Sequence, residues 1–418
     1  MGVAYFCRMQ KQNQRPHFEF VVLMAALMSI VALAIDALLP AIPEIGLAIQ
    51  SMDPTDNQLL VTMIFLGLGA GQLLFGPISD SLGRKPVVYI GFFIFLLASF
   101  ICLYAPSLEI MVLGRIFQGV GLAAPRTIAI SMIRDSYRGD RMAKIMSFVT
   151  AFFILVPVIA PALGKLILDQ SGWQAIFYVQ MAMALIIGFW FWNRQPETLS
   201  PEHKIPFNGR NFIKGTKEFF RHRDTVVFTL NSGLLNGAFL VYLSSAQHIF
   251  VDQYGLEENF PFIFAGLAFS IGLSTFLNGT LVMRFGMRRL SLTASVVFCL
   301  VALLYAIWFK DAPNPGIFVL LGFLSVLFLC LGFVWGNFRS MAMEPIGHIA
   351  GIGAAINGFV STMISIPIAT FIGSFVVDSV WPLFMGLALC GLCSLAAFLL
   401  LGSPRRRRLS TVQSPWGR

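Results

Sequence analysis

Long apolar runs, separated by short polar segments, cover most of this chain. Each run has about 20 residues or more, the length that an α-helix needs to cross a bilayer. Strands of a membrane barrel alternate between apolar and polar positions over about ten residues. Because these runs are continuously apolar, we expect helices. The pattern predicts them at 19–42, 58–79, 87–105, 109–133, 142–168, 173–193, 225–250, 260–283, 289–309, 315–341, 348–376 and 379–402.

The composition favours a membrane protein over a soluble one. Of the 418 residues, 57% are hydrophobic and 12% are charged, whereas typical soluble domains are about 25% charged. Twelve spanning helices use about 240 residues, which leaves little apolar sequence for a separate soluble core. A soluble globular enzyme, a secreted disulfide scaffold and a disordered protein are therefore excluded.

The sequence carries no motif for a metal or an organic cofactor. Five of the six cysteines lie in apolar runs, and Cys390-Gly-Leu-Cys393 has no second pair of ligands. The five histidines do not have the spacing of a zinc site. A phosphate-binding glycine loop is also missing, so ATP-driven transport is disfavoured. We expect no cofactor and a process driven by the proton gradient.

Basic residues gather on one side of the predicted spans. Of the 29 Lys and Arg residues, 25 fall in the N-terminal segment, in alternate loops and in the tail, whereas the opposite loops are acidic or bare. Because cytoplasmic loops collect Lys and Arg, both termini are expected in the cytoplasm. The net charge of +9 reflects this topology, and no nucleic-acid partner is expected. The Arg405–Arg408 run is a stop signal at the lipid headgroups or a regulatory tail.

The longest polar stretch divides the chain into two halves. We expect a cytoplasmic N-terminal segment, a six-helix bundle, a cytoplasmic linker, a second six-helix bundle and a basic tail at 1–18, 19–193, 194–224, 225–402 and 403–418. Within the linker, 211–220 is expected to form a short amphipathic helix at the inner membrane surface.

An internal repeat supports this division. The segment Gly76-Pro-Ile-Ser-Asp-Ser-Leu-Gly-Arg-Lys85 joins the second and third spans, and Gly279-Thr-Leu-Val-Met-Arg-Phe-Gly-Met-Arg-Arg289 joins the eighth and ninth. Both glycines of the first segment recur 203 residues later. Two halves with one topology are typical of a transporter with its site at the interface of the repeats. A channel is more often built from identical subunits around a pore.

Three ionisable residues lie inside predicted spans, where each costs about 2.5–3.5 kcal/mol to insert. Asp36 and Arg115 both fall about six residues, or roughly 9 Å, from the outer ends of their spans. We expect them to pair, directly or through water. Burial and a neighbouring cation act in opposite directions on the proton affinity of a carboxyl group, so this pair can serve as a proton switch. A static ion pair and an Asp36 exposed at the outer rim are the alternatives.

Further polar residues in the apolar spans are candidates for a substrate cavity. Arg126 lies eleven residues beyond Arg115, which is about three turns and nearly the same face. It either binds an anionic or carbonyl group or bonds to backbone carbonyls as a packing residue. The other candidates are Gln118, Asn236, Tyr242, Gln247, Asn337 and Asn357.

Several segments resemble motifs of a known family. Gly76–Pro86 resembles the loop 2–3 signature of the major facilitator superfamily, and Arg115-Ile-Phe-Gln-Gly-Val-Gly121 resembles the span-four motif of its proton-coupled members. Pro157–Gly164 is similar to the span-five antiporter motif, with Ala160-Pro161 in place of Gly-Pro. Three more segments narrow the resemblance to the Bcr/CflA branch, the bicyclomycin-resistance type of drug/proton antiporter: Asp36-Ala-Leu-Leu-Pro40, Arg134-Asp135 and Gly172-Trp-Gln-Ala-Ile-Phe177.

The resemblance implies an all-α membrane protein of twelve helices in two pseudo-symmetric six-helix bundles, the major facilitator fold. It further implies that Asp36 and Arg115 couple proton movement to the substrate. The family's conformational switch maps onto Gly76, Asp80, Gly83, Arg84, Lys85, Arg134 and Asp135, and the antiporter motif onto Pro157, Pro161 and Gly164. In the second loop Met283 replaces the acidic residue, so charge-network roles do not carry over there.

The expected function is efflux of a small organic compound across a bacterial inner membrane in exchange for protons, by alternating access. Family substrates include amphiphilic antibiotics, dyes and some metabolites. The partners are then the substrate, protons and the lipid bilayer, with both halves in one monomeric unit. A proton-coupled importer or metabolite exporter on the same scaffold is the main alternative. A channel or a membrane-embedded enzyme is a further one, although the chain has no catalytic cluster beyond the three ionisable residues in its spans.

Overall fold

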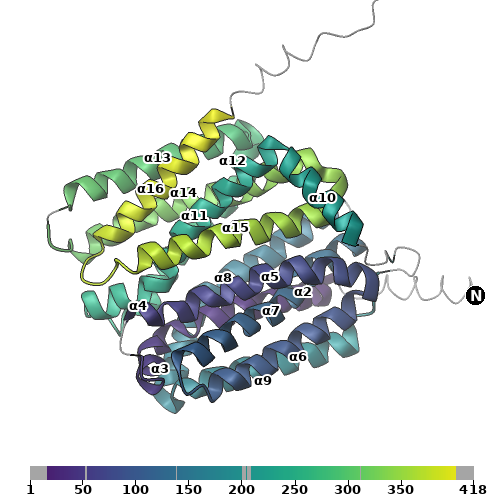
Figure 1. Ribbon diagram of the computed structural model, residues 1–418, viewed down its shortest axis with the longest axis horizontal. Helices are drawn as coiled ribbons and strands as arrows, with labels where there is room; N and C mark the ends of the chain where they lie inside the picture. Colours follow the sequence, from purple (N-terminus) through teal and green to yellow (C-terminus); the bar gives the residue numbers. More distant parts are fainter. Residues whose placement is uncertain are drawn as a thin grey trace, which may run out of the picture. The chain divides into compact units, whose positions relative to one another are not determined.

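The computed structural model describes residues 17–401 except 52–53, 138, 200–203, 205–208 and 311. The expected N-terminal segment up to residue 16 and the basic tail with Arg405–Arg408 lie outside the described residues. Within these limits the chain is all-helical (Figure 1). Each of the twelve predicted runs corresponds to a helix: α2 (His17–Asp36), α5 (Leu59–Leu82), α6 (Arg84–Leu103), α7 (Leu108–Ser136), α8 (Gly139–Ser171), α9 (Trp173–Arg194), α11 (Arg223–Gln247), α12 (Phe260–Phe285), α13 (Met287–Trp308), α14 (Ile317–Met343), α15 (Ala350–Gly373) and α16 (Trp381–Leu400).

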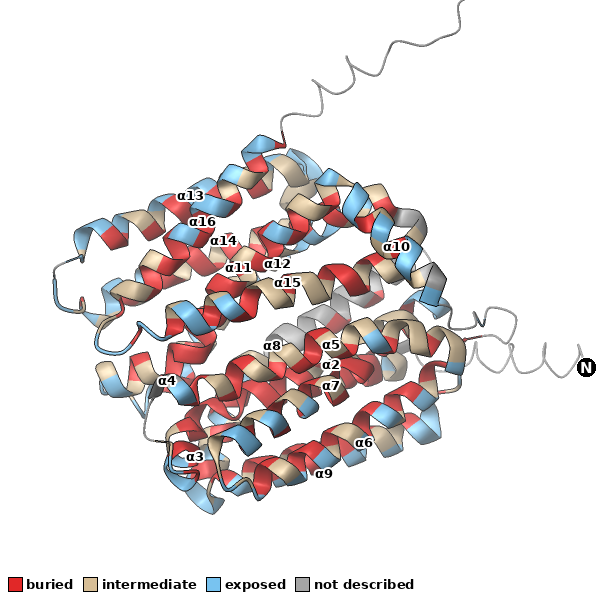
Figure 2. Ribbon diagram, in the orientation of Figure 1, coloured by how far each residue is buried: buried red, intermediate tan, exposed pale blue. Residues whose placement is uncertain are grey.

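The length and hydropathy of these helices fit a multi-pass membrane protein. Eleven of them, among the described residues, are long and apolar enough to cross a membrane. The remaining one, α8, covers the predicted fifth span, and the side chains of its first half are mostly outside the described part. Exposed residues recur along α6 and α9 (Figure 2). The large apolar side chains of Phe189 and Trp192 on α9 are more than half exposed. Lipid contact explains this exposure, since the bilayer is as apolar as these side chains.

The first span differs from its prediction, which ran without a break to residue 42. The helix α2 ends at Asp36, and a 3₁₀ turn η1 (Leu39–Ala41) and a short helix α3 (Ile42–Ala48) follow. Pro40 and Pro43 stand in the first turns of these two elements. A proline ring cannot donate a backbone hydrogen bond to the preceding turn, but it fits the start of a helix. Asp36 therefore lies at a helix end rather than inside a continuous helix.

Contacts divide the chain into two compact units. Unit 1 comprises Met1–Arg210 and Leu243–Gly272, and unit 2 comprises Asn211–Tyr242 and Leu273–Arg418. The segment 243–272, which the sequence assigned to the second bundle, thus groups with unit 1. One reason is an ion pair between Lys165 Nζ of α8 and Glu257 Oε1, 2.6 Å apart. The six-residue π-helix η3 (His248–Gln253) also belongs to this segment.

Glycines allow the helices of unit 1 to pack closely around α7, which runs beside α5 and α6 (Figure 1). A Cβ atom on Gly67 of α5 would clash with the carbonyl oxygen of Ile116 on α7. On the other side of α7, a Cβ atom on Gly91 of α6 would meet the carbonyl of Gly121. Small residues at these positions let membrane helices approach backbone to backbone. This packing fixes which residues of α5 and α6 lie beside the polar residues of α7.

The short amphipathic helix predicted in the linker is confirmed as α10 (Gly209–Arg221), in unit 2. Phe219 is fully buried, whereas Ile213 and Phe220 are more than half exposed.

Within unit 2 α13 packs against α16, where Tyr305 stacks on Phe384 with ring centroids 3.6 Å apart.

Candidate functional site

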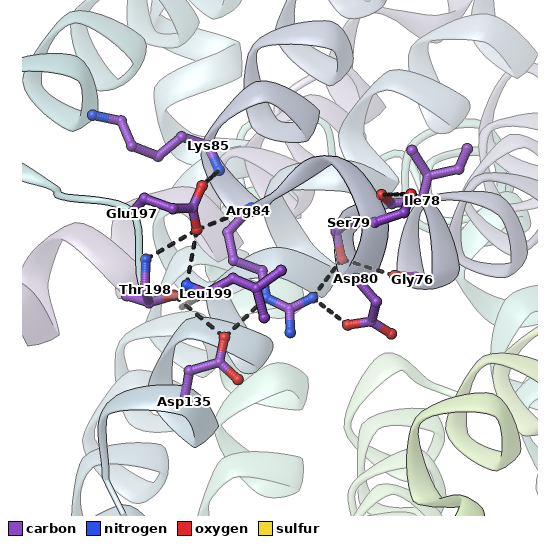
Figure 3. A network of polar contacts seen from close by, with 11 residues as sticks. Gly76, Ile78, Ser79, Asp80, Arg84, Lys85, Asp135, Glu197, Thr198 and Leu199 are labelled. Atoms are coloured by element: carbon purple, nitrogen blue, oxygen red, sulfur yellow. Dashed lines mark hydrogen bonds and ion pairs between the residues drawn. The ribbon is translucent and has the colours of Figure 1, made fainter. Parts of the chain in front are cut away.

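The turn between α5 and α6 carries a charge cluster in unit 1 (Figure 3). Arg84, which is 2% exposed, lies at its centre. Its Nη1 donates to Asp80 Oδ1 at 2.6 Å and to Ser79 Oγ at 2.7 Å, and its Nε donates to Asp135 Oδ2 at 2.9 Å. The structure thus brings together Asp80, Arg84 and Asp135, and links the end of α5, the start of α6 and the end of α7.

The remaining residues of the predicted switch surround this cluster. Gly83 has a φ of +112°, a conformation that favours glycine, and it separates α5 from α6. The carbonyl oxygen of Gly76 accepts a hydrogen bond from Ser79 Oγ at 2.8 Å. Lys85 extends its Nζ to the carbonyl oxygen of Trp192 on α9, at 3.2 Å. Arg134 is exposed beside Asp135 and lies outside the bonded network of the described residues.

Glu197, which the sequence analysis missed, completes the cluster from the start of the linker. Its Oε1 accepts hydrogen bonds from the backbone N–H of Arg84 at 3.1 Å, and its Oε2 from that of Lys85 at 3.0 Å. Oε1 also accepts from the N–H groups of Thr198 and Leu199, at 2.9 and 3.0 Å. The first N–H groups of a helix have no partner within the helix. The carboxylate of Glu197 satisfies two of them in α6 and attaches the linker there.

The linker makes a second contact with the cluster through Thr198. Its hydroxyl donates to Asp135 Oδ2 at 3.3 Å, the same oxygen that accepts from Arg84. The sequence signal for this contact was an acidic residue, Glu197, placed directly after the sixth span. It does not reveal which helix start the carboxylate would cap.

Arg115 is fully buried in α7 and bonds to two neighbouring helices. Its Nε donates to the carbonyl oxygen of Leu60 on α5 at 2.8 Å, and its Nη1 to that of Ala34 on α2 at 3.2 Å. Nη1 also donates to Gln118 Oε1 at 2.8 Å, and the Gln118 amide donates to Ser99 Oγ on α6 at 2.8 Å. Nη2 of Arg115 is buried and has no partner in the described part of the chain. The guanidinium therefore retains a free donor.

Asp36 lies two residues beyond the carbonyl that Arg115 contacts. It is 5% exposed, so the alternative of a carboxylate open at the outer rim is wrong. The expected direct pair is not formed either, because Arg115 binds the backbone of Ala34 instead of the carboxylate. Within the described residues, Asp36 makes no hydrogen bond or ion pair. The sequence predicted that Asp36 and Arg115 lie at the same depth in their spans. The hydrogen bond from Arg115 to the carbonyl of Ala34, two residues before Asp36, agrees with this.

The antiporter-like motif of α8 meets the chain directly after Asp36. A Cβ atom on Gly164 would clash with the carbonyl oxygen of Ala37, so only glycine allows this approach. Pro157 and Pro161 lie inside the same helix, where each removes one backbone hydrogen bond. The motif residues thus shape α8 where it packs against the end of α2.

Two of the predicted cavity residues act in helix packing within unit 2. Asn337 of α14 and Asn278 of α12 exchange two amide hydrogen bonds, of 2.9 and 3.2 Å. Asn357 of α15 donates to Thr229 Oγ1 of α11 at 2.7 Å. Both asparagines are buried, so in this conformation their amides are used between helices.

The other cavity candidates lie in different environments. Tyr242 is buried and packs edge to face on Phe328, with ring centroids 4.7 Å apart. Asn236 is half-buried in the same helix, α11, and Arg126 is half-buried in α7. Gln247 groups with unit 1 and lines a pocket there. Arg126 and Gln247 therefore belong to unit 1, and Asn236 and Tyr242 belong to unit 2.

The second copy of the loop keeps the glycine turn of the first without its acidic residue. Gly286 has a φ of +80° and precedes α13, as Gly83 precedes α6. Met283, in place of an acidic residue, is 87% exposed. Arg288 lies over the ring of Phe398, 5.4 Å from its centroid. The repeat thus preserves a turn, whereas the charge cluster occurs in the first half.

Comparison with known proteins identifies relatives along most of the chain. The bicyclomycin resistance protein homolog of Haemophilus influenzae is 24% identical over 411 residues, covering 94% of this chain and 98% of that protein. The multidrug resistance protein MdtL of Vibrio parahaemolyticus is 26% identical and covers 92% and 96%. The uncharacterized MFS-type transporter YdgK of Bacillus subtilis is 27% identical and covers 82% and 85%.

A solved structure shares the fold. The crystal structure of a D-xylose-proton symporter matches with a TM-score of 0.71 at 16% sequence identity, covering 90% of this chain and 97% of that one. The sequence itself matches the Major Facilitator Superfamily over residues 24–370. The chain is therefore a membrane transporter that belongs to the Major Facilitator Superfamily.

Proposed function

We propose that this transporter exports small organic molecules in exchange for protons. The observation that carries the proposal is the position of Asp36. It is a buried carboxyl group at the end of α2, two residues after the carbonyl that the buried guanidinium of Arg115 contacts, and this guanidinium has a free donor. The names of the bacterial relatives, which refer to drug resistance, support the substrate class. The excess of Lys and Arg on one side of the predicted spans supports cytoplasmic termini.

Asp36 is suited to carry the proton because a buried ionised carboxylate needs a partner. An isolated carboxylate is expensive to bury, whereas its protonated form has no net charge to desolvate. Arg115 would stabilise the ionised form by turning Nη2, which lacks a bond, toward the carboxylate. The proton then leaves when Arg115 is in reach and returns when the guanidinium is held by the Ala34 carbonyl.

The packing around Asp36 would connect this proton step to a helix movement. Gly164 of α8 touches the backbone at Ala37, so a change at the end of α2 displaces α8. The charge cluster around Arg84 would hold one conformation until the proton step releases it. One charge that crosses 100 mV supplies about 2.3 kcal/mol, which sustains roughly a fifty-fold gradient of a neutral substrate at 1.4 kcal/mol per factor of ten.

Reconstitution tests the proposal. The purified chain in proteoliposomes should move ethidium against its gradient when an inward-directed proton gradient is imposed, and it should release protons on addition of ethidium. Asp36→Asn should abolish the proton-driven transport, and Asp36→Glu should keep part of it. Glu44→Gln, which neutralises an exposed carboxylate of α3, is the matched control and should transport as the wild type does.

The result also separates the alternatives. Accumulation of ethidium in the direction of the proton gradient would indicate an importer. Equal transport with and without the gradient, together with an active Asp36→Asn variant, would refute proton coupling through this residue.

A further inference from the structure

A polar pocket lies in unit 1, where the end of the first span meets the end of α11 and the π-helix η3. It has a volume of about 200 Å³, which leaves room for several water molecules. All its lining residues belong to unit 1, and the residues assigned to proton coupling are not among them. They are Ile42, Pro43, Leu47, Ser51, Asn57, Gln58, Ser244, Gln247, His248 and Asp252.

One wall presents buried polar atoms that lack partners. Gln58 is 6% exposed and Asn57 is 7% exposed. Gln58 Nε2, Asn57 Oδ1 and Ser51 Oγ have no hydrogen-bond partner in the described part of the chain. Gln58 is the N-cap residue of α5, but its side chain does not cap the helix. An unsatisfied buried donor or acceptor costs about 1–3 kcal/mol, so these atoms indicate that something else binds here.

The amide of Asn57 is held in place for such a contact. Its Nδ2 donates to the carbonyl oxygen of Ser51 at 3.2 Å. The acceptor Oδ1 of the same amide is left without a partner, as is the donor Nε2 of the adjacent residue, Gln58. Together these two side chains and Ser51 Oγ offer both donors and acceptors to a ligand with hydroxyl or amide groups.

The other wall supplies a negative charge. On η3, His248 Nδ1 and Asp252 Oδ2 lie 2.7 Å apart. The side chain of His248 is 12% exposed and that of Asp252 is 45% exposed. The lining includes no Lys or Arg, so the carboxylate of Asp252 favours a cationic group. Single-turn π segments occur often at functional sites.

We propose that this pocket binds a small organic cation that also carries hydroxyl groups, such as an amino alcohol. The ammonium group faces Asp252, and the hydroxyl groups bond to Gln58, Asn57 and Ser51. Ile42, Pro43 and Leu47 contact the carbon skeleton. The acidic loops favour a position of the pocket on the non-cytoplasmic side, and we expect the ligand to reach it from there. This site goes beyond the proposed exchange, since it does not include Asp36 or Arg115.

Three probes with the same carbon skeleton test the proposal. The full chain in lipid nanodiscs is titrated with 2-amino-1,3-propanediol, isopropylamine and glycerol, and binding is followed by saturation-transfer NMR. The aminodiol should bind saturably. Isopropylamine, which lacks the hydroxyl groups, and glycerol, which lacks the charge, should each bind at least tenfold more weakly.

Variants assign the binding to the two walls. Gln58→Leu and Asp252→Asn should each weaken aminodiol binding at least tenfold. Gln180→Leu is the matched control for the first, because Gln180 of α9 is also buried with an unsatisfied amide but does not line the pocket. It should bind the aminodiol as the wild type does. Gln58→Leu should melt no lower than the wild type, since it removes an unsatisfied donor.

The proposal is overturned if the aminodiol does not bind saturably, which would leave a pocket filled by water alone. It is also overturned if the three probes bind equally, or if Gln58→Leu binds as the wild type does. Should that variant fail to fold, the ranking of the three probes on the wild-type chain decides.

Discussion

Replacing Glu197 by alanine should detach the start of the linker from α6. The carboxylate accepts four backbone hydrogen bonds, two of them at the first residues of α6. Loss of a helix-capping side chain costs about 0.5–2 kcal/mol, and loss of a negative charge at a helix N-terminus costs about 0.3–1 kcal/mol.

The exposure of Glu197 reduces these values. Because the residue is exposed, water replaces part of what the variant loses, and we expect a net cost of about 1–2 kcal/mol. Since 1.4 kcal/mol corresponds to a factor of ten, the segment should open roughly 5–30 times more often. The effect should be local, because the bonds of Arg84 to Asp80 and Asp135 do not involve Glu197.

Hydrogen exchange followed by mass spectrometry measures this opening. Peptides that cover 84–88 and 195–199 should exchange faster in Glu197→Ala by the same factor, and those of α13 should not change. Glu197→Gln should give an intermediate rate, since the amide keeps one acceptor oxygen without the charge. Glu258→Ala, which removes an exposed carboxylate elsewhere in unit 1, controls for the loss of charge. Exchange in Glu197→Ala within twofold of the wild type would refute the capping role.

Three further variants probe the packing of unit 1 by thermal unfolding in detergent. Gly164→Ala places a methyl group against a backbone carbonyl and should lower the free energy of unfolding by about 1–3 kcal/mol. Gly188→Ala, where a Cβ atom has room, should leave it unchanged. Equal melting temperatures of the two variants would contradict the close approach. Arg115→Lys cannot make all three hydrogen bonds of the guanidinium and should lower the free energy of unfolding by about 1.5–3 kcal/mol. A melting temperature equal to that of the wild type would show that these bonds contribute little. Arg84→Lys loses the forked contact with two carboxylates, so its melting temperature should fall well below that of Arg134→Lys at an exposed site.

The internal repeat shows that the glycine turn can be kept where the charge cluster is not. Gly83 and Gly286 both adopt a positive φ before a helix, and the equal spacing of the glycines in the sequence already indicated this. The requirement is local, because a residue without a Cβ atom adopts this conformation readily. The charge cluster also needs carboxylates on α5 and α7, and the second loop has Met283 at the acidic position.

The sequence alone determined the twelve helices and their membrane character, and its motifs indicated Asp80, Arg84 and Asp135 of the charge cluster but not Glu197. These features depend on runs of apolar residues and on short motifs. Both can be recognised from residues that are adjacent in the sequence. Proline positions could also have shown the helix end at Asp36, since Pro40 and Pro43 mark new helix starts.

Only the tertiary structure decided which partners the polar residues take. Arg115 binds backbone carbonyls of α2 and α5, Asn337 binds Asn278, and Glu197 caps α6. A backbone carbonyl carries no sequence signature, and an amide accepts many partners. Which of them comes within 3 Å depends on how closely the helices approach, and glycines such as Gly67 and Gly164 set that distance through contacts between residues far apart in the chain.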